Sequence, residues 1–143
     1  MAREEILVDV SPDRVFEVLA DPDSYADWVV GAADVRGADD EWPAPGSELH
    51  HTQGVGPFTL KDETIVLEAE RPSRLVLLAE IEPLGKMRIT VELEEEGQGT
   101  RVTLTEEPES GAVETADNPL SDWLLGKRNT VALQRLKRIA ETA

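Results

Sequence analysis

The sequence predicts an α+β domain: a curved antiparallel sheet of about six to seven strands wrapped around a long C-terminal helix, with two short helices after the first strand. Three observations predict it. One long helical stretch closes the chain, strand-like runs separated by short turns fill the middle, and two proline-led helix starts follow the first run. At 143 residues the chain fits one domain, residues 1–143, and can bury about two-thirds of its unfolded surface.

The first strand and the two short helices lie in the first thirty residues. Residues 4–10 place apolar side chains at alternate positions, which indicates a strand. Ser11 followed by Pro12 is an N-cap signal that starts the first helix. The Asp-Pro pair at 21–22 repeats the signal, so we expect a second short helix over 21–28 and a bend between the two.

The sheet is predicted from a repeating pattern in the middle of the chain. An edge strand is expected at 34–37, followed by five runs at 47–53, 60–70, 75–81, 86–94 and 100–107. The breaks between the five runs read GVGP, RPS, EPLG and EEGQG. Breaks this short join antiparallel neighbours, so the runs form a meander.

Alternation in the later strands assigns their inner face. Met87 and Ile89 lie on the apolar side of their strand, and Val102 and Leu104 lie on the apolar side of the next. The same parity brings Glu106 inward.

The earlier strands are less clear. Leu49 sets an inner parity that turns His51 and Gln53 inward. The 60–70 strand permits two assignments, because one apolar set would turn Glu63 inward and a competing set, which includes Val66, would not.

The closing helix spans 118–142, with Asn118 as N-cap and Pro119 at its first position. Its apolar stripe consists of Leu125, Ala132, Leu133, Leu136, Ile139 and Ala140. Asn129 falls within that stripe. Burying an unpaired amide costs about 1–3 kcal/mol, so Asn129 either faces a polar cavity or bonds to a strand or helix carbonyl.

Composition limits the partners. The 30 acidic and 14 basic residues give a formal charge of −16, which repels nucleic acid and anionic membranes. The chain has no cysteine, its start does not resemble a signal peptide, and no stretch approaches the length that spans a bilayer. We therefore expect a cytoplasmic protein with no nucleic-acid partner and no integral membrane segment.

Several segments carry a family resemblance. The stretches SPDRVFEVLADPDSYADWVVG, PGSELHH, GVGPFTLKDET, RPSRLVL, GTRVTLTEEPESG and RNTVALQRLKRIAE are similar to the polyketide cyclase/dehydrase and lipid-transport group of the START-like, helix-grip superfamily. The resemblance covers nearly the whole chain. It implies a helix-grip fold and the binding of lipids, hormones, polyketides or aromatic metabolites, and it matches Arg128 and Asn129 to an RN pair in the last helix.

A cavity between sheet and helix is the predicted site. The predicted ligand-binding residues are Trp28, Gln53, Glu63, Met87, Ile89, Arg128 and Asn129. His51 and Glu106 are the candidate catalytic residues, because an imidazole and a carboxyl group in an apolar pocket can exchange protons near neutral pH. The alternative is that both lie at an open strand end, where they meet solvent or pair with an arginine.

Three functions are compatible with these residues. The first is binding of a small hydrophobic or aromatic ligand. The second, which the family resemblance implies, is a polyketide aromatase/cyclase or dehydratase, in which one group removes an α-proton and another stabilises the enolate. The third is a protein-interaction module. Trp123 marks either a pocket entrance or a homodimer contact. Neither cofactor nor metal is expected, because His50 and His51 point to opposite faces of a strand.

Overall fold

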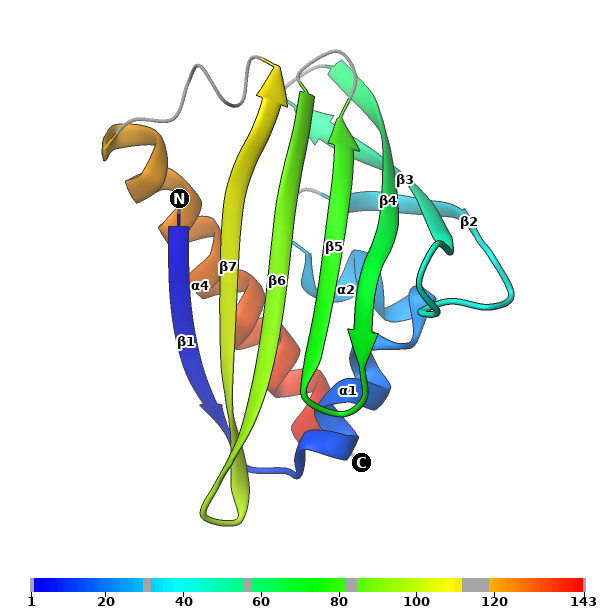
Figure 1. Ribbon diagram of the computed structural model, residues 1–143. Coiled ribbons are helices and arrows are strands. Elements are labelled where there is room, and N and C mark those ends of the chain that lie inside the picture. Colours follow the sequence, from blue (N-terminus) through cyan, green and yellow to red (C-terminus); the bar gives the residue numbers. More distant parts are fainter. Residues whose placement is uncertain (1, 30–31, 56–57, 82–84, 112–118, 143) are drawn as a thin grey trace.

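The computed structural model describes residues 2–29, 32–55, 58–81, 85–111 and 119–142, with the backbone alone at 26, 32–36, 51–55, 58–62, 81, 110–111 and 119–125 (Figure 1). Its elements are β1 (Ala2–Val8), α1 (Pro12–Leu19), the 3-10 turn η1 (Pro22–Ser24), α2 (Tyr25–Trp28), β2 (Ala32–Ala38), β3 (Glu48–Val55), β4 (Phe58–Glu70), β5 (Arg74–Ile81), β6 (Gly85–Glu96), β7 (Gly99–Gly111) and α4 (Pro119–Glu141).

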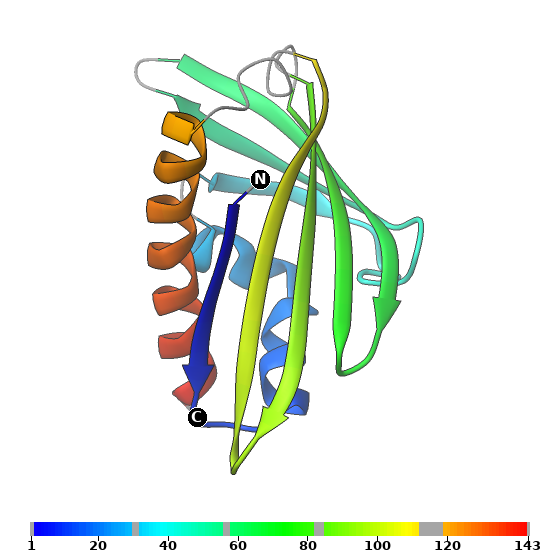
Figure 2. The ribbon, with the colours of Figure 1, turned by 60° about the vertical axis from the view of Figure 1, so that its left-hand side comes forward.

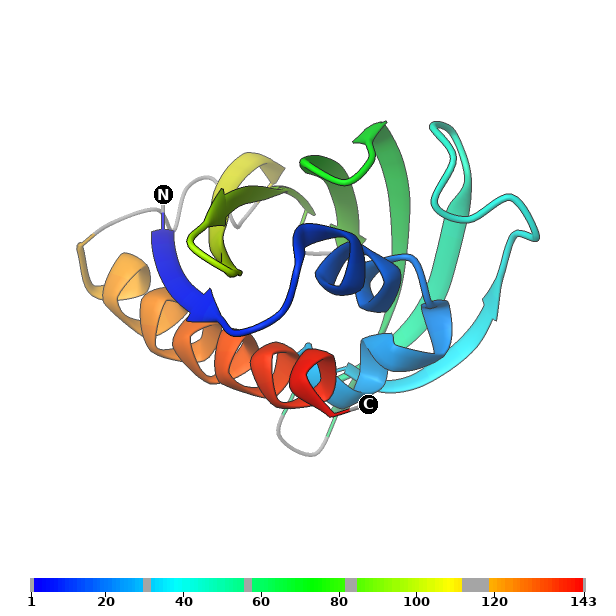
Figure 3. The same cartoon turned by 90° about the horizontal axis from the view of Figure 1, so that it is seen from below.

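The strands form one seven-stranded antiparallel sheet in the order β1-β7-β6-β5-β4-β3-β2. The meander from β2 to β7 follows the chain, and β1 joins it beside β7. This confirms the predicted fold class and places the expected edge strand, β2, at an edge. Figure 3 shows the sheet curving around α1, with α4 running beneath β1 and past α2.

Helix α4 packs chiefly along β1, with further contacts to α1, α2 and β7 (Figure 2). Four residues of its predicted stripe are buried: Ala132, Leu133, Leu136 and Ala140. Asn129, inside the same stripe, is also buried. The predicted cap Asn118 and the side chain of Leu125 lie outside the described residues. No helix in the described part of the chain is long and apolar enough to cross a membrane.

Alternation in β6 and β7 is as predicted, since Met87, Val91, Leu104 and Glu106 are all buried. Strand β4 resolves the ambiguous parity in favour of Thr64 and Val66, which are 0% and 1% exposed.

Leu67 is 41% exposed because it alternates with the buried Val66, whereas the register shift between Val66 and Glu68 brings Ala69 to the inner face. The apolar alternation through Leu67 therefore belongs to the outer face. Glu63 is exposed on that face, so the prediction that it points inward is wrong.

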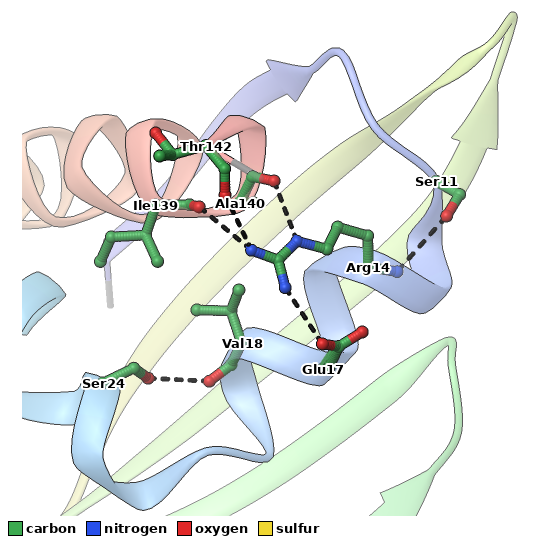
Figure 4. Close-up of polar contacts among 8 residues, drawn as sticks. All are labelled: Ser11, Arg14, Glu17, Val18, Ser24, Ile139, Ala140 and Thr142. Atoms are coloured by element: carbon green, nitrogen blue, oxygen red, sulfur yellow. Dashed lines mark hydrogen bonds and ion pairs between the residues drawn. The ribbon is translucent and has the colours of Figure 1, made fainter.

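Arg14 joins the start of the chain to the end of α4 (Figure 4). Ser11 caps α1 as predicted, because its Oγ accepts from the backbone N–H of Arg14 at 3.3 Å. The guanidinium then donates to three carbonyls at the C-terminus of α4: Nε to Ala140 at 3.1 Å, and Nη2 to Ile139 at 3.4 Å and Thr142 at 3.0 Å. A cation suits the negative end of the helix dipole, and its N–H groups satisfy carbonyls that have no partner within the helix.

A second tie forms beside it. Glu141 Oε2 accepts from the backbone N–H of Asp9 at 2.8 Å and from Lys137 Nζ at 2.6 Å. Lys137 also donates to the carbonyl of Leu7 at 3.0 Å. The C-terminal turn of α4 is therefore fastened both to the end of β1 and to α1.

We expect Arg14→Met to lower the free energy of unfolding by about 1–3 kcal/mol, because it removes charged donors from three helix carbonyls while keeping the apolar stem. Urea denaturation measures the change. Arg3→Met is the matched control, since Arg3 is exposed and pairs with Glu5 on the surface; it should cost under about 0.5 kcal/mol. Equal losses of unfolding free energy in the two variants would show that the bonds from Arg14 to the end of α4 contribute no more than a surface ion pair.

The second tie predicts a pH dependence. The hydrogen bond from Lys137, and then that from the Asp9 backbone, hold the pKa of Glu141 below its ordinary 4.5. The stabilisation is therefore present above the unfolded-state pKa and is lost as pH falls through the folded-state value. Melting temperatures of wild type and Glu141→Gln should differ most above about pH 5 and converge as the pH drops below about 4. A constant difference over that range would rule the linkage out.

Candidate functional site

A small buried cavity lies between α2, the inner faces of β6 and β7, and α4. Its volume is about 20 Å³, which is room for about one water molecule. It is lined by Tyr25, Trp28, Val29, Ile89, Leu104, Glu106, Arg128, Asn129 and Ala132. Most of these side chains are apolar or aromatic, with a few polar groups among them. That composition is typical of a small-ligand site.

Helix α2 supplies an aromatic wall. Its single turn places Tyr25 and Trp28 edge to face, with ring centroids 5.4 Å apart. Tyr25 also meets Trp42 edge to face at 6.5 Å. The turn is held to α1 by Ser24, whose Oγ donates to the carbonyl of Val18 at 2.8 Å.

Two buried N–H donors belong to residues of the lining. Asn129 is 2% exposed and Trp28 is 4% exposed. Asn129 Nδ2 and Trp28 Nε1 have no acceptor among the described residues. For Asn129, the prediction of a cavity position agrees with this geometry better than the alternative of a bond from its N–H to a helix or strand carbonyl.

An ion pair crosses from the sheet to α4 in the same cavity. Arg128 Nη2 lies 2.8 Å from each carboxylate oxygen of Glu106. The Glu106 side chain is 5% exposed and that of Arg128 is 34% exposed, so the pair runs from the interior to the surface. The Glu106 carboxylate therefore lines the cavity and pairs with an arginine, and its catalytic role stays a prediction.

The two candidate catalytic residues lie on distant strands. His51 lies in β3, opposite Val35 and Asp62, and β3 is separated from β7 by β4, β5 and β6. The side chains of His51 and Gln53 lie outside the described residues. Their inward orientation and their roles stay predictions.

Two other predicted ligand residues are placed elsewhere. Met87 is 7% exposed and is buried on β6, but it is not among the residues that line this cavity. Glu63 is on the outer face, where its carboxylate lies 3.6 Å from Nδ1 of His50. Glu63 alternates with the buried Thr64 and so lies outside the candidate site, which corrects its assignment as a ligand residue.

Some lining residues were missed by the sequence reasoning although their signals were present. Leu104 shares the parity of Glu106, and Ala132 belongs to the same helical stripe as Asn129. Tyr25 and Val29 flank Trp28 in sequence. For Leu104 and Ala132 the pattern predicts core, because a pattern of burial does not distinguish a packed side chain from one beside a void, whereas the bend from Tyr25 to Trp28 is predicted as a wall of the cavity.

Glu4 is a further inward acid, outside the cavity lining. Gly126 of α4 is buried against it, since a Cβ at Gly126 would lie 2.7 Å from Glu4 Oε1. The absence of a side chain at Gly126 thus leaves room for the Glu4 carboxylate beside α4. Across the described residues, no cluster of three or more histidine, aspartate or glutamate side chains could hold a metal ion.

Comparison with known proteins identifies the family. Residues 2–141 match the family described as polyketide cyclase / dehydrase and lipid transport. The chain belongs to this family, and its fold is of the helix-grip type. No curated protein sequence matches it significantly.

Solved structures share the fold at low sequence identity. A protein from Chromobacterium violaceum superposes with a TM-score of 0.74 at 17% identity, over 99% of this chain and 97% of that one. DynU16, a protein of the dynemicin biosynthetic locus, gives 0.72 at 18% identity, over 99% of this chain and 47% of its own. The Aha1 dimer from Colwellia psychrerythraea gives 0.72 at 15% identity, over 99% and 96%.

The ion pair in the cavity can be tested by its energetics. Arg128→Met should lower the free energy of unfolding by about 2–3 kcal/mol, because it leaves the buried Glu106 carboxylate without its cation and Arg128 is only partly buried. Replacing both members, as Glu106→Leu with Arg128→Met, should restore most of that loss. Urea denaturation of the double-mutant cycle measures both effects.

Arg88→Met is the control for that cycle. Arg88 pairs with Glu109 on the outer face, with both side chains partly exposed, and its loss should cost under about 1 kcal/mol. Suppose that Arg128→Met lowered the free energy of unfolding no more than Arg88→Met. Burial of the Glu106 carboxylate would then not depend on its pairing with Arg128.

Proposed function

We propose that the chain binds a small, predominantly apolar molecule, lipid or polyketide-like, in the cavity between α2, β6, β7 and α4. The observation that carries the proposal is the buried Asn129 amide, which lines an apolar cavity and has a donor without an acceptor among the described residues. Such a donor is costly in a packed core and useful in a binding site.

The energy of binding would come mainly from the apolar walls. Removing about 200 Å² of ligand surface from water contributes about 5 kcal/mol. The polar groups of Asn129 and of the Glu106–Arg128 pair would then fix the orientation of the ligand. Pockets that enclose drug-sized ligands measure about 300–1,000 Å³, so binding requires the cavity walls to move apart.

The comparisons support this class of ligand. The family description pairs lipid transport with polyketide cyclisation and dehydration. One structural neighbour belongs to the dynemicin biosynthetic locus. Both point toward apolar or polyketide-like molecules rather than nucleotides or sugars.

A second candidate is a cyclase or dehydratase that uses Glu106. The observation that favours it is the placement of a carboxylate inside the cavity, with Arg128 to balance its charge. A carboxylate at this position could accept an α-proton from a bound ketone. In that case Glu106→Gln should lower turnover of a poly-β-ketone substrate by about a hundredfold or more while the substrate still binds. If the wild-type protein binds the substrate but does not convert it, the enzymatic function is rejected and only the binding function remains.

Filling the cavity is the direct test of binding. Ala132 is 4% exposed and lines the cavity, so Ala132→Leu should weaken binding of any ligand there by about tenfold or more through steric exclusion. Isothermal titration with fatty acids, flavonoids and aromatic polyketides measures the affinities. Val131→Leu is the control, because Val131 neighbours Ala132 on α4 and is 40% exposed; its affinities should equal those of the wild type.

Two outcomes would count against the proposal. One is that no member of the panel binds the wild-type protein. The other is that a ligand binds wild type and Ala132→Leu equally, which would place it elsewhere. Circular dichroism of both variants checks that the fold is retained.

A further inference from the structure

We infer that the ligand presents a neutral carbonyl oxygen to two donors, Trp28 Nε1 and Asn129 Nδ2. The inference rests on the proposed function and narrows its ligand class from apolar molecules in general to neutral ketones, lactones and related carbonyl compounds.

The first step is the distribution of unpaired donors. In the described part of the chain, three buried side-chain nitrogen atoms have no hydrogen-bond partner: Trp28 Nε1, Trp42 Nε1 and Asn129 Nδ2. Two of the three belong to residues that line one cavity. They come from separate elements, α2 and α4, which contact each other at the cavity.

The second step is the size of the space. A cavity of about 20 Å³ holds little more than one water-sized atom group. An oxygen atom placed there would lie among the lining residues, which include Trp28 and Asn129. A carbonyl oxygen carries two lone pairs, so it can accept from an indole N–H and an amide N–H at once.

The third step is the charge of the site. The Glu106 carboxylate balances the charge of Arg128, so the pair offers no net positive charge to an anionic ligand. A ligand carboxylate would stand beside the Glu106 carboxylate in a chain of formal charge −16. Like charges at short range in a low-dielectric cavity repel strongly. A pure hydrocarbon would avoid this repulsion but would leave both donors unpaired.

The choice of a neutral acceptor can be tested with three matched naphthalenes that carry their substituent at the same ring position. These are acetylnaphthalene, its isosteric alkene isopropenylnaphthalene, and naphthoate. The wild-type protein should bind the ketone about tenfold more tightly than the alkene and at least tenfold more tightly than the carboxylate. Isothermal titration gives the affinities. The indole N–H resonance of Trp28 should shift downfield with the ketone relative to the alkene.

Three variants identify the donors. Asn129→Leu removes the amide NH2 group and Trp28→Phe removes the indole N–H, so each should reduce the ketone preference to about threefold or less while the alkene still binds. Trp42→Phe is the matched control. Trp42 also carries a buried indole N–H without a partner but does not line the cavity, so its loss should leave the preference unchanged.

The outcomes separate this inference from the proposed function. If the ketone and the alkene bind wild type equally, or if the preference persists in both donor variants, the inference is wrong and the binding function stands. If none of the three compounds binds, and the wider ligand panel also fails, the binding function itself is wrong. Thermal melts of each variant confirm that loss of preference does not reflect unfolding.

Discussion

The candidate site depends on a contact at the far end of the molecule, the clamp of Arg14 on the C-terminus of α4. Three carbonyls of the last turn accept from one guanidinium, and Glu141 ties the same turn to the backbone of Asp9. Asn129 lies about 16 Å back along this rigid helix. With one end fixed and the helix laid along β1, the direction of the helix decides where Arg128 and Asn129 meet the sheet. A substitution at Arg14 would therefore shift Arg128 and Asn129 in the cavity wall, although Arg14 does not itself line the cavity.

The charge distribution explains how an acidic chain tolerates a buried carboxylate. Outside, the convex face of the sheet spreads its acids among cations: Arg101 contacts Glu96 and Glu5, and Arg74 contacts Glu68 and Glu92. Inside, Glu106 has one cation of its own, Arg128, supplied by α4. Pairs on the surface contribute little to stability, whereas an interior carboxylate without its partner is strongly unfavourable. The Glu106–Arg128 pair thus couples the register of β7 to the rotation of α4. The ion pairs on the outer face of the sheet do not involve α4.

Much of the fold could be predicted, because its signals are local. Alternation in β6 and β7 is regular, so Glu106 was correctly placed inward, and the stripe of α4 identified Asn129 as a polar residue in an apolar face. The error at Glu63 arose because Ala69 alternates in sequence with Ile65 and Leu67, whereas the register shift between Val66 and Glu68 places Ala69 on the same face as Val66, which no alternation rule anticipates. The pairing of Glu106 with Arg128 joins residues that are neighbours only after α4 has packed on the sheet. Cavity walls such as Leu104 and Ala132 cannot be separated from core by sequence, because whether they line a void depends on the packing of every neighbour.

The small volume of the cavity restricts how a ligand can enter. Moving Arg128 outward would abandon the buried Glu106 carboxylate, which costs about 3–5 kcal/mol when such a pair is fully buried. Moving α4 as a whole would break the clamp at Arg14 and the tie at Glu141. Helix α2 is a single turn without a side-chain cap, and its Trp28 N–H forms no bond within the described residues that displacement would break. Its fastening to α1 runs through Ser24, one residue before the helix begins. A shift of α2 therefore breaks neither the Glu106–Arg128 ion pair nor the clamp on α4, so Asn129 stays in place to meet the ligand while Trp28 remains on the wall that moves.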